Sequence, residues 1–322
     1  MIEKPKVCIA SLGACGGCDE AIVDLNENLL NVAGLVDLIF WPTAMDFKYH
    51  DIEAMRDSEI ALSLVSGHVR NSEQQEISKL IRRKSQLVLA FGSCACFGGT
   101  SGLANFRTKE DIMDWVYHSA PTVINPKGAQ PETKVRTSNG KELTLPEFFN
   151  RVYALKQSID VDYYLPGCPP PTDLIMNCIN AVLQNKMPLK GSTLAPHRAQ
   201  CDTCKRNSGK PTSIVIGEIK RIHQVEARPD ICFLAQNILC MGPATRGGCG
   251  ETCININLPC RGCFGPVGGV EDSGVKFLSS LASLVKFESS ADIQKFTDEI
   301  DDLAGYLYRF SLPVSKLGNI KG

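Results

Sequence analysis

The chain has 322 residues and a formal net charge of −1, with 43% hydrophobic and 21% charged residues. This length allows two domains with sizeable cores, and the near-zero charge gives no electrostatic case for a nucleic-acid or anionic-membrane partner. The first residues lack the basic stretch, long apolar core and twin-arginine pair of an export signal. No apolar stretch approaches the about 20 residues that span a bilayer. We therefore expect a cytoplasmic protein without a membrane span.

The first part of the chain alternates short β-branched apolar runs with amphipathic stretches. This pattern predicts buried strands at residues 6–10, 36–40, 60–65, 87–91 and 162–165. It predicts helices at residues 19–30, 72–83 and 172–183, with Ser72 and Thr172 as N-caps. Strands alternating with helices favour an α/β fold that is flavodoxin-like, a doubly wound parallel sheet with helices on both faces.

The second part of the chain has a different pattern. Residues 124–145 are polar and rich in turn formers, so we interpret them as a loop or insertion. Proline and glycine residues within 186–196 predict a boundary, which divides the chain into domains 1–190 and 191–322. Residues 196–269 show little periodicity except a strand-like run at 213–219, and the tail 274–310 is again helical. The second domain is therefore predicted to be smaller and irregular, with helices, and held together by metal.

Fifteen cysteines need an explanation in a reducing cytoplasm, where clustered thiols usually bind metal. Three of the predicted strands lead into glycine-rich loops that contain Cys15, Cys18, Cys94 and Cys168. Ligands of open α/β sheets bind beyond the carboxyl ends of the strands, so these thiols are expected to meet. Four thiolates suit a 4Fe–4S cluster or a zinc ion by count, and the glycines favour the cluster. A thioredoxin-like redox pair at Cys15 and Cys18 is the alternative.

Eight further cysteines lie in the irregular part, at Cys201, Cys204, Cys232, Cys240, Cys249, Cys253, Cys260 and Cys263. Their number divides into two four-thiolate sites, with two zinc sites as the competing interpretation. Cys8 and Cys178 fall inside a predicted strand and helix, so we interpret both as small buried hydrophobic residues. Cys96 is an alternative to Cys94 as the ligand, and we prefer Cys94. These twelve thiols are sufficient, so we do not assign His68 or His197 as ligands.

The motifs together resemble the small-subunit family of nickel–iron hydrogenases over almost the whole chain. The resemblance is carried, in order, by the Cys15/Cys18 pair, the loop Gly92-Ser-Cys94-Ala-Cys96-Phe-Gly98 and the motif Gly167-Cys168-Pro169-Pro170. These motifs alone are also similar to a cluster-bearing subunit of respiratory complex I, which lacks a second cysteine-rich domain. The eight later cysteines therefore favour the hydrogenase family.

The resemblance implies a role for each set of thiols. In this family, the proximal cluster is the one nearest the nickel–iron centre of a separate large subunit. In this chain it would be held by Cys15, Cys18, Cys94 and Cys168. The distal ligands would be Cys201, Cys204, Cys232 and Cys240, and the medial ligands Cys249, Cys253, Cys260 and Cys263. Many periplasmic members have histidine at the place of Cys201 and proline at that of Cys253, so this chain is expected to hold three 4Fe–4S clusters. Gly17 and Gly99 stand where oxygen-tolerant members add cysteines, which implies an ordinary proximal cubane.

Within the family, the stretches around Cys201 and from Cys240 to Cys249 most resemble the methyl-viologen-reducing hydrogenases of methanogenic archaea. Those enzymes do not reduce coenzyme F-420. The resemblance implies an electron-transfer subunit that relays electrons from H2 to a partner such as heterodisulfide reductase. The small subunit of a coenzyme F-420-reducing hydrogenase and a zinc-stabilised scaffold are the alternative functions.

Three charged residues near the predicted ligands are candidates for smaller roles. Glu20 matches a glutamate common in the family and is a candidate proton relay, with a helix-dipole interaction in the first helical turn as the alternative. Arg246 and Arg261 flank predicted medial ligands and are candidates for tuning a cluster potential, with solvent-facing positions as the alternative.

Overall fold

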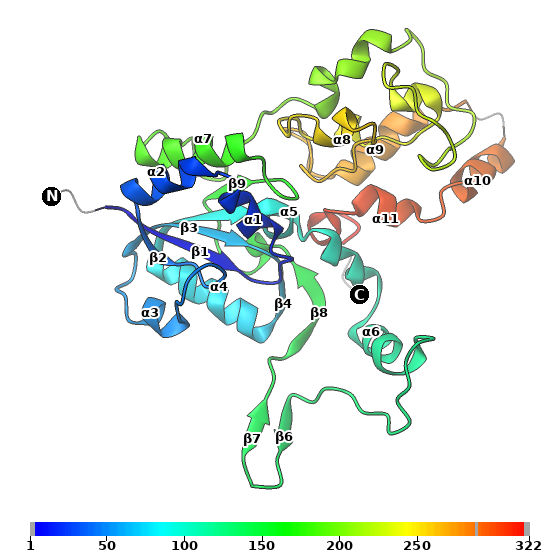
Figure 1. The fold of residues 1–322 in the computed structure, drawn as a ribbon. Helices are drawn as coiled ribbons and strands as arrows, with labels where there is room; N and C mark the ends of the chain where they lie inside the picture. Colours follow the sequence, from blue (N-terminus) through cyan, green and yellow to red (C-terminus); the bar gives the residue numbers. More distant parts are fainter. Residues whose placement is uncertain (1–3, 287–288, 319–322) are drawn as a thin grey trace.

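A parallel five-stranded sheet forms the centre of the first part of the chain in the computed structural model, which describes residues 4–286 and 289–318 (Figure 1). Its strands, in sheet order, are β2 (Asp37–Phe40), β1 (Lys6–Ser11), β3 (Ile60–Ser66), β5 (Ser85–Phe91) and β9 (Tyr163–Leu165). Numbered by their order in the chain, these strands follow 2-1-3-4-5, which is the flavodoxin-like order. The predicted fold class is therefore confirmed.

Helices cover both faces of this sheet (Figure 1). One face packs against α1 (Gly17–Val23), α2 (Glu27–Leu35) and α7 (Thr172–Leu183), and the other against α3 (Tyr49–Glu53), α4 (Ser72–Lys84) and α5 (Gly92–Phe97). Side chains alternate along a strand, so in β1 Val7 and Ile9 enter one apolar cluster while Cys8 and Ala10 enter the other. Burial on both faces explains why the strands appear in the sequence as continuous apolar runs.

Both predicted N-caps are one residue too late. The N-cap of α4 is Asn71, whose side-chain oxygen accepts a 2.8 Å hydrogen bond from the N–H of Gln74. Ser72 is the first helical residue, because the extended backbone of Asn71 already brings its side chain to the third N–H of the helix. In α7, Pro171 stands at the cap position and Thr172 begins the helix.

The prediction of one continuous helix at residues 19–30 is wrong. The helix is split into α1, which ends at Val23, and α2, which begins at Glu27. Asn26 interrupts it with a φ of 52°, a left-handed value that asparagine tolerates better than most residues. The side-chain amide of Asn26 donates to the carbonyl of Asp24 at 2.9 Å and so stabilises the break.

Residues 107–147 form an arm that extends from the sheet domain (Figure 1). It carries α6 (Lys109–Asp114) and an antiparallel hairpin of β6 (Lys134–Arg136) and β7 (Glu142–Thr144). At its base, β4 (Val69–Asn71) pairs with β8 (Phe148–Tyr153). Residues 124–145, which we interpreted as a loop or insertion, belong to this arm. They contain a hairpin that was not expected, because β6 and β7 pair around a turn in which Gly140 has a φ of 81°.

The later part of the chain has its own apolar cluster, which includes Phe233, Phe277 and Leu307. Its helices are α8 (Thr252–Asn255), α9 (Ser273–Ala282), α10 (Ser290–Asp298) and α11 (Leu303–Tyr308), which confirms the helical tail apart from residues 287–288, which lie outside the described residues. The strand expected at 213–219 is wrong. Only Ile216 forms a bridge, with Val285, because this run has no neighbouring strand among the described residues.

The end of the described chain packs back onto the sheet domain. A Cβ on Gly98 or Gly102 would lie 2.3 or 2.4 Å from ring atoms of Pro313, so both glycines are needed for this contact. The side-chain amide of Gln157 donates to the carbonyl of Pro313 at 2.9 Å. Separate apolar clusters agree with a division near residue 190, while the exact boundary between 1–190 and 191–322 stays a prediction.

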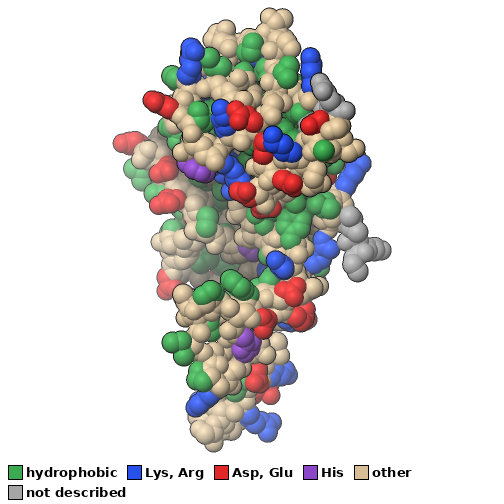
Figure 2. Space-filling view, turned by 90° about the vertical axis from the view of Figure 1, so that its right-hand side faces the viewer, with side chains coloured by type: hydrophobic (Ala, Val, Ile, Leu, Met, Phe, Trp, Pro, Cys, Tyr) green, Lys and Arg blue, Asp and Glu red, His purple; other side chains and the backbone are tan. Residues whose placement is uncertain are grey.

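Within residues 4–286 and 289–318, no helix combines the length and the apolar character that a membrane crossing requires. Figure 2 shows acidic and basic side chains mixed over the face that it presents, with the arm at its narrow lower end.

Candidate functional site

Four of the predicted ligands lie where three parallel strands end. Cys15 and Cys18 lie between β1 and the first turn of α1, Cys94 lies in α5 directly after β5, and Cys168 follows β9. Burial raises the pKa of Cys94 to about 11, and the neighbouring Cys168 and Cys15 contribute to this rise. Burial likewise raises the pKa of Cys18, with additional contributions from Cys94, Cys168 and Cys15. The four thiols therefore lie close enough to influence one another, as the strand-end argument predicts.

Two glycines allow these thiols to approach the backbone. A Cβ on Gly92 would lie 2.3 Å from the Sγ of Cys18, and one on Gly99 would lie 2.4 Å from the Sγ of Cys94. Both glycines also have a positive φ, 85° and 62°, which disfavours other residues. The loops thus bring the thiols of Cys18 and Cys94 close against the backbone.

The eight later cysteines lie near one another, and their division into two groups stays a prediction. In the predicted distal group, burial raises the pKa of Cys201 to about 12, and Cys232, Cys204 and the predicted medial ligand Cys260 contribute to this rise. The Sγ atoms of Cys201 and Cys240 both lie close to Gly242, at 3.0 and 3.6 Å from where its Cβ would be. The distal group predicted from the resemblance, Cys201, Cys204, Cys232 and Cys240, is therefore brought together.

The second group surrounds a cavity of about 320 Å³ between the sheet domain and the later part of the chain. All four predicted medial ligands line it, Cys249, Cys253, Cys260 and Cys263, and so does Cys168 of the strand-end group. Burial raises the pKa of Cys260 to about 11, and Cys249 and Cys253 contribute to this rise. A single water molecule needs about 10–15 Å³ of such volume, so the cavity has room for a polyatomic group.

Direct contacts place the three groups in series. The N–H of Cys260 donates to the Sγ of Cys240 at 3.3 Å, which joins the medial and distal groups. The hydroxyl of Ser93, next to Cys94, donates to the carbonyl of Cys263 and joins the strand-end and medial groups. The strand-end group therefore lies at one end and the distal group at the other.

The spacing of the thiols bears on which metal they fit. Among the described residues, no group of three or more His, Cys, Asp or Glu side chains is gathered closely enough to hold a single metal ion. Soft thiolates are ligands of both zinc and iron–sulfur clusters. The open volume beside Cys168, Cys249, Cys253, Cys260 and Cys263 suits the bulkier core of a cluster.

The remaining cysteines lie outside the three groups. Cys8, Cys96 and Cys178 are buried, and the thiol of Cys96 donates to the carbonyl of Ala90 at 3.3 Å. Cys94, by contrast, is half-buried beside the other strand-end thiols. Burial raises the pKa of Cys96, and Cys18 and Cys94 also contribute to this rise, so Cys96 lies near this group and the choice of Cys94 as the ligand stays a prediction.

Neither histidine considered above belongs to a thiol group. His68 lies against Gly13, and its pKa is lowered to about 4 by burial and by Arg70. His197 packs against Gly268.

The charged residues predicted near the ligands take different positions. Arg246 is buried and donates to the carbonyl of Pro196 at 3.0 Å, whereas Arg261 lines the medial cavity. Glu20 is exposed on α1.

Sequence reasoning missed two residues beside the ligands. Asp19 is buried next to Cys18 and accepts hydrogen bonds from the hydroxyl of Ser11 at 2.5 Å and the indole N–H of Trp41 at 2.8 Å. Its position next to a ligand was the available signal. Ser93 also adjoins a ligand, but nothing in the sequence indicates its contact with Cys263.

Comparison with known proteins decides the family. A family model described as "NADH ubiquinone oxidoreductase, 20 Kd subunit" matches residues 15–182. The iron-sulfur subunit of the F420-non-reducing hydrogenase of Archaeoglobus profundus is 40% identical over 96% of this chain and 96% of its own length. A subunit of the F420-non-reducing hydrogenase of Methanothermobacter marburgensis is 35% identical over 98% of this chain and 96% of its own length. The chain belongs to the small-subunit family of nickel–iron hydrogenases.

The hydrogenase small subunit is of the F420-non-reducing type, because these relatives match it over nearly the whole chain. This finding argues against the F-420-reducing alternative. Small subunits of this family carry iron–sulfur clusters and pair with a nickel–iron large subunit. The protein also shares its fold with a solved NiFeSe hydrogenase from Desulfovibrio Vulgaris Hildenborough, at 17% identity and a TM-score of 0.50 over 82% of this chain and 94% of that chain.

Proposed function

We propose that this small subunit relays electrons from H2 oxidation at the large subunit through three 4Fe–4S clusters held by the three thiol groups. The observation that carries the proposal is the continuous series of four-thiol groups, joined by the Ser93–Cys263 and Cys260–Cys240 contacts. The strand-end, medial and distal groups would hold the proximal, medial and distal clusters, with the twelve ligands predicted from the sequence. Such clusters supply one-electron transfer when bound.

The residues of the chain would hold these clusters, exclude water and keep the thiols in their anionic form. Burial raises the pKa of Cys94 and Cys260 to about 11, so neither would be ionised at neutral pH without a metal. Metal binding is therefore expected to release protons and to fix the loops at the same time. The N–H of Cys260 supports Cys240 by donating to its sulfur.

The position of the groups suggests which end meets which partner. Cys15 and Cys168 of the strand-end group are exposed in the isolated chain, so this edge would face the large subunit. The distal group at the other end would face the electron acceptor. Heterodisulfide reductase is our proposal for this acceptor, and the cytoplasm is our proposal for the location. H2-dependent reduction of purified heterodisulfide reductase by the complex tests this partner, and its absence while H2 still reduces a viologen dye would exclude it.

Glu20 is proposed as a proton relay because it is exposed on α1 beside the strand-end thiols. The variant Glu20→Gln should slow H2 oxidation and hydrogen-isotope exchange together. Glu27→Gln, on neighbouring α2, is the control and should change neither. Unchanged rates in Glu20→Gln would remove this role.

Replacing one distal ligand tests the relay itself. Cys204→Ser should lower the iron content of the complex and reduce H2-dependent dye reduction at least tenfold, because the last group in the series is damaged. Hydrogen-isotope exchange, which needs only the large-subunit centre, should persist. The matched control is Cys178→Ser in α7, outside the three groups, which should retain both iron and dye reduction. Full dye reduction by Cys204→Ser despite a lost cluster would contradict the relay.

A further inference from the structure

Arg206 is the largest fully buried side chain among the described residues, at 1% exposure. It lies two residues after Cys204. Its guanidinium carbon stands 3.9 Å from the centroid of the Phe233 ring, and Phe233 directly follows Cys232. A buried cation is unfavourable by several kcal/mol unless hydrogen bonds or a negative charge compensate it.

Hydrogen bonds from Arg206 join three segments around the distal group. Its Nη1 donates to the carbonyls of Arg228 and Ile231 at 2.6 and 2.8 Å. Its Nη2 donates to the side-chain oxygen of Asn257, just beyond α8, and Asn257 in turn donates to the carbonyl of Ala227 at 2.8 Å. These acceptors are neutral, so they orient the guanidinium without balancing its charge.

No carboxylate in the described parts of the chain forms an ion pair with Arg206. Asp230, on the adjacent loop, pairs instead with Arg228 at 3.2 Å. The Nε of Arg206 is buried without a hydrogen-bond partner. Arg206 follows Cys204 by two residues, and the Phe233 ring against its guanidinium directly follows Cys232. The buried cation, without an ion pair of its own among the described residues, therefore lies between two segments that carry distal thiols.

We propose that Arg206 is the counter-ion of the cluster held by Cys201, Cys204, Cys232 and Cys240, and that its charge raises the reduction potential of this cluster. This inference rests on the proposed function. Four thiolates give the site a negative charge, and each added electron increases it. A fixed cation in a poorly solvated position therefore stabilises the reduced form more than the oxidised form.

The competing role for Arg206 is purely mechanical, in which its hydrogen bonds hold the loops and its charge is irrelevant. Two variants separate these roles in the complex with the large subunit. Arg206→Gln removes the charge and keeps amide donors, whereas Arg206→Lys keeps the charge and loses the planar fork. Arg228→Met is the matched control, because it removes a guanidinium that is 66% exposed on the adjacent loop.

The measurement is a redox titration followed by electron paramagnetic resonance, together with iron and sulfide content. In Arg206→Gln, the reduced-to-oxidised ratio of one cluster at a fixed potential should fall about tenfold, equivalent to about 59 mV for a one-electron couple. Arg206→Lys and Arg228→Met should keep all midpoint potentials close to those of the wild type. Unchanged potentials in an iron-replete Arg206→Gln, or an equal shift in Arg206→Lys, would overturn the proposal.

Loss of the cluster from Arg206→Gln would also be decisive. If Arg206 compensates the cluster's charge, the Arg206→Lys variant should retain its iron. If its role is only mechanical, the Arg206→Lys variant should retain no more iron than the Arg206→Gln variant. A wild-type complex without about twelve irons in this subunit would instead refute the proposed function, so the two failures are distinguishable.

Discussion

At the scale of single residues, Gly92 and Gly17 differ in what a side chain would meet. A Cβ on Gly92 would lie 2.3 Å from the Sγ of Cys18, whereas one on Gly17 would lie 3.6 Å from the Sγ of Cys15. The first distance forces the thiol to move, and the second is an ordinary contact. Gly92 also has a φ of 85°, which alanine would strain.

We therefore predict that Gly92→Ala lowers the iron and acid-labile sulfide of the complex by about four each, the content of one 4Fe–4S cluster. Gly17→Ala is the control and should retain the full content. Chemical analysis of the two purified variants checks this prediction. A full complement of iron and sulfide in Gly92→Ala would show that the present position of Cys18 is not needed to bind the cluster.

The sequence predicted residues whose chemistry is visible in their type and spacing, and missed those that act through distant contacts. The strand-end argument anticipated that Cys15, Cys18, Cys94 and Cys168 would meet. Arg206 gave no signal, because burial and the contact with Phe233 depend on how irregular loops fold together.

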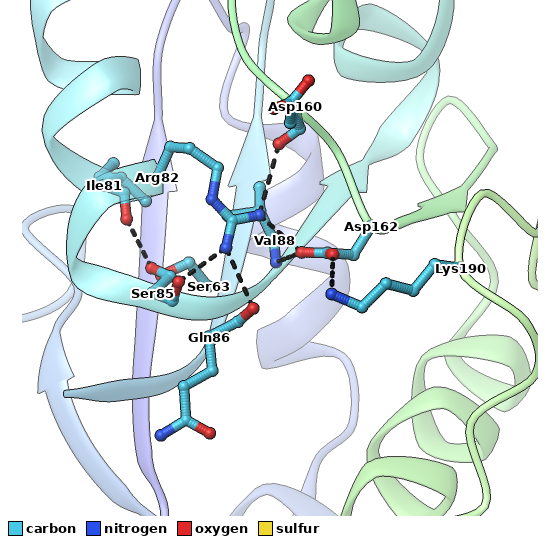
Figure 3. A network of polar contacts seen from close by, with 9 residues as sticks. All are labelled: Ser63, Ile81, Arg82, Ser85, Gln86, Val88, Asp160, Asp162 and Lys190. Carbon is cyan, nitrogen blue, oxygen red and sulfur yellow. Dashed lines mark hydrogen bonds and ion pairs between the residues drawn. The ribbon is translucent and has the colours of Figure 1, made fainter. Parts of the chain in front are cut away.

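At the scale of secondary-structure elements, a polar network ties the start of β9 to α4 and β5 (Figure 3). Asp162 is buried and forms ion pairs of 2.6 Å with both Arg82 and Lys190, and it accepts the N–H of Val88 at 2.8 Å. Burial alone raises the pKa of Asp162, but the hydrogen bonds from Lys190, Arg82 and Val88 outweigh this effect and lower it. The ionised carboxylate therefore stabilises the folded state at neutral pH.

Asp162→Asn should lower the free energy of unfolding by about 2 kcal/mol, because it removes both ion pairs and keeps one acceptor for Val88. The apparent melting temperature at a fixed scan rate should fall by several degrees, with cluster content unchanged. Asp46→Asn is the control, since the Asp46–Lys48 pair is largely exposed. An equal melting temperature for Asp162→Asn and the wild type would contradict this role.

The elements with clear periodicity were predicted well, and those defined by local backbone geometry were not. All five strands of the sheet were found from their apolar runs. The break at Asn26 and the cap at Asn71 depend on single backbone conformations that hydrophobic periodicity does not report. The hairpin of β6 and β7 was missed because its exposed strands are only three residues long, so one apolar residue in each is too little to reveal a period.

At the scale of the whole molecule, the medial group lies between the other two, so under the proposed relay its properties would affect electron transfer through the entire subunit. Cys253 is the second residue of α8, in the first turn, where backbone N–H groups have no partner within the helix. Proline is tolerated at such positions. The backbone should therefore accept Cys253→Pro even though a thiol is lost.

Cys253→Pro should keep the fold and lower the iron content by about one per chain, as expected if a three-iron cluster replaces the medial cubane. H2-dependent dye reduction should fall while isotope exchange persists. Electron paramagnetic resonance of the oxidised complex and iron analysis check this outcome. Unchanged iron in this variant would mean that Cys253 is not a ligand.

The central claim, three iron–sulfur clusters in one subunit, is tested most directly by anaerobic analysis of iron, acid-labile sulfide and zinc in the complex with the large subunit. The account predicts about twelve irons and twelve sulfides for this subunit, with negligible zinc. Zinc without sulfide would contradict it and would leave a structural metal scaffold in place of an electron relay.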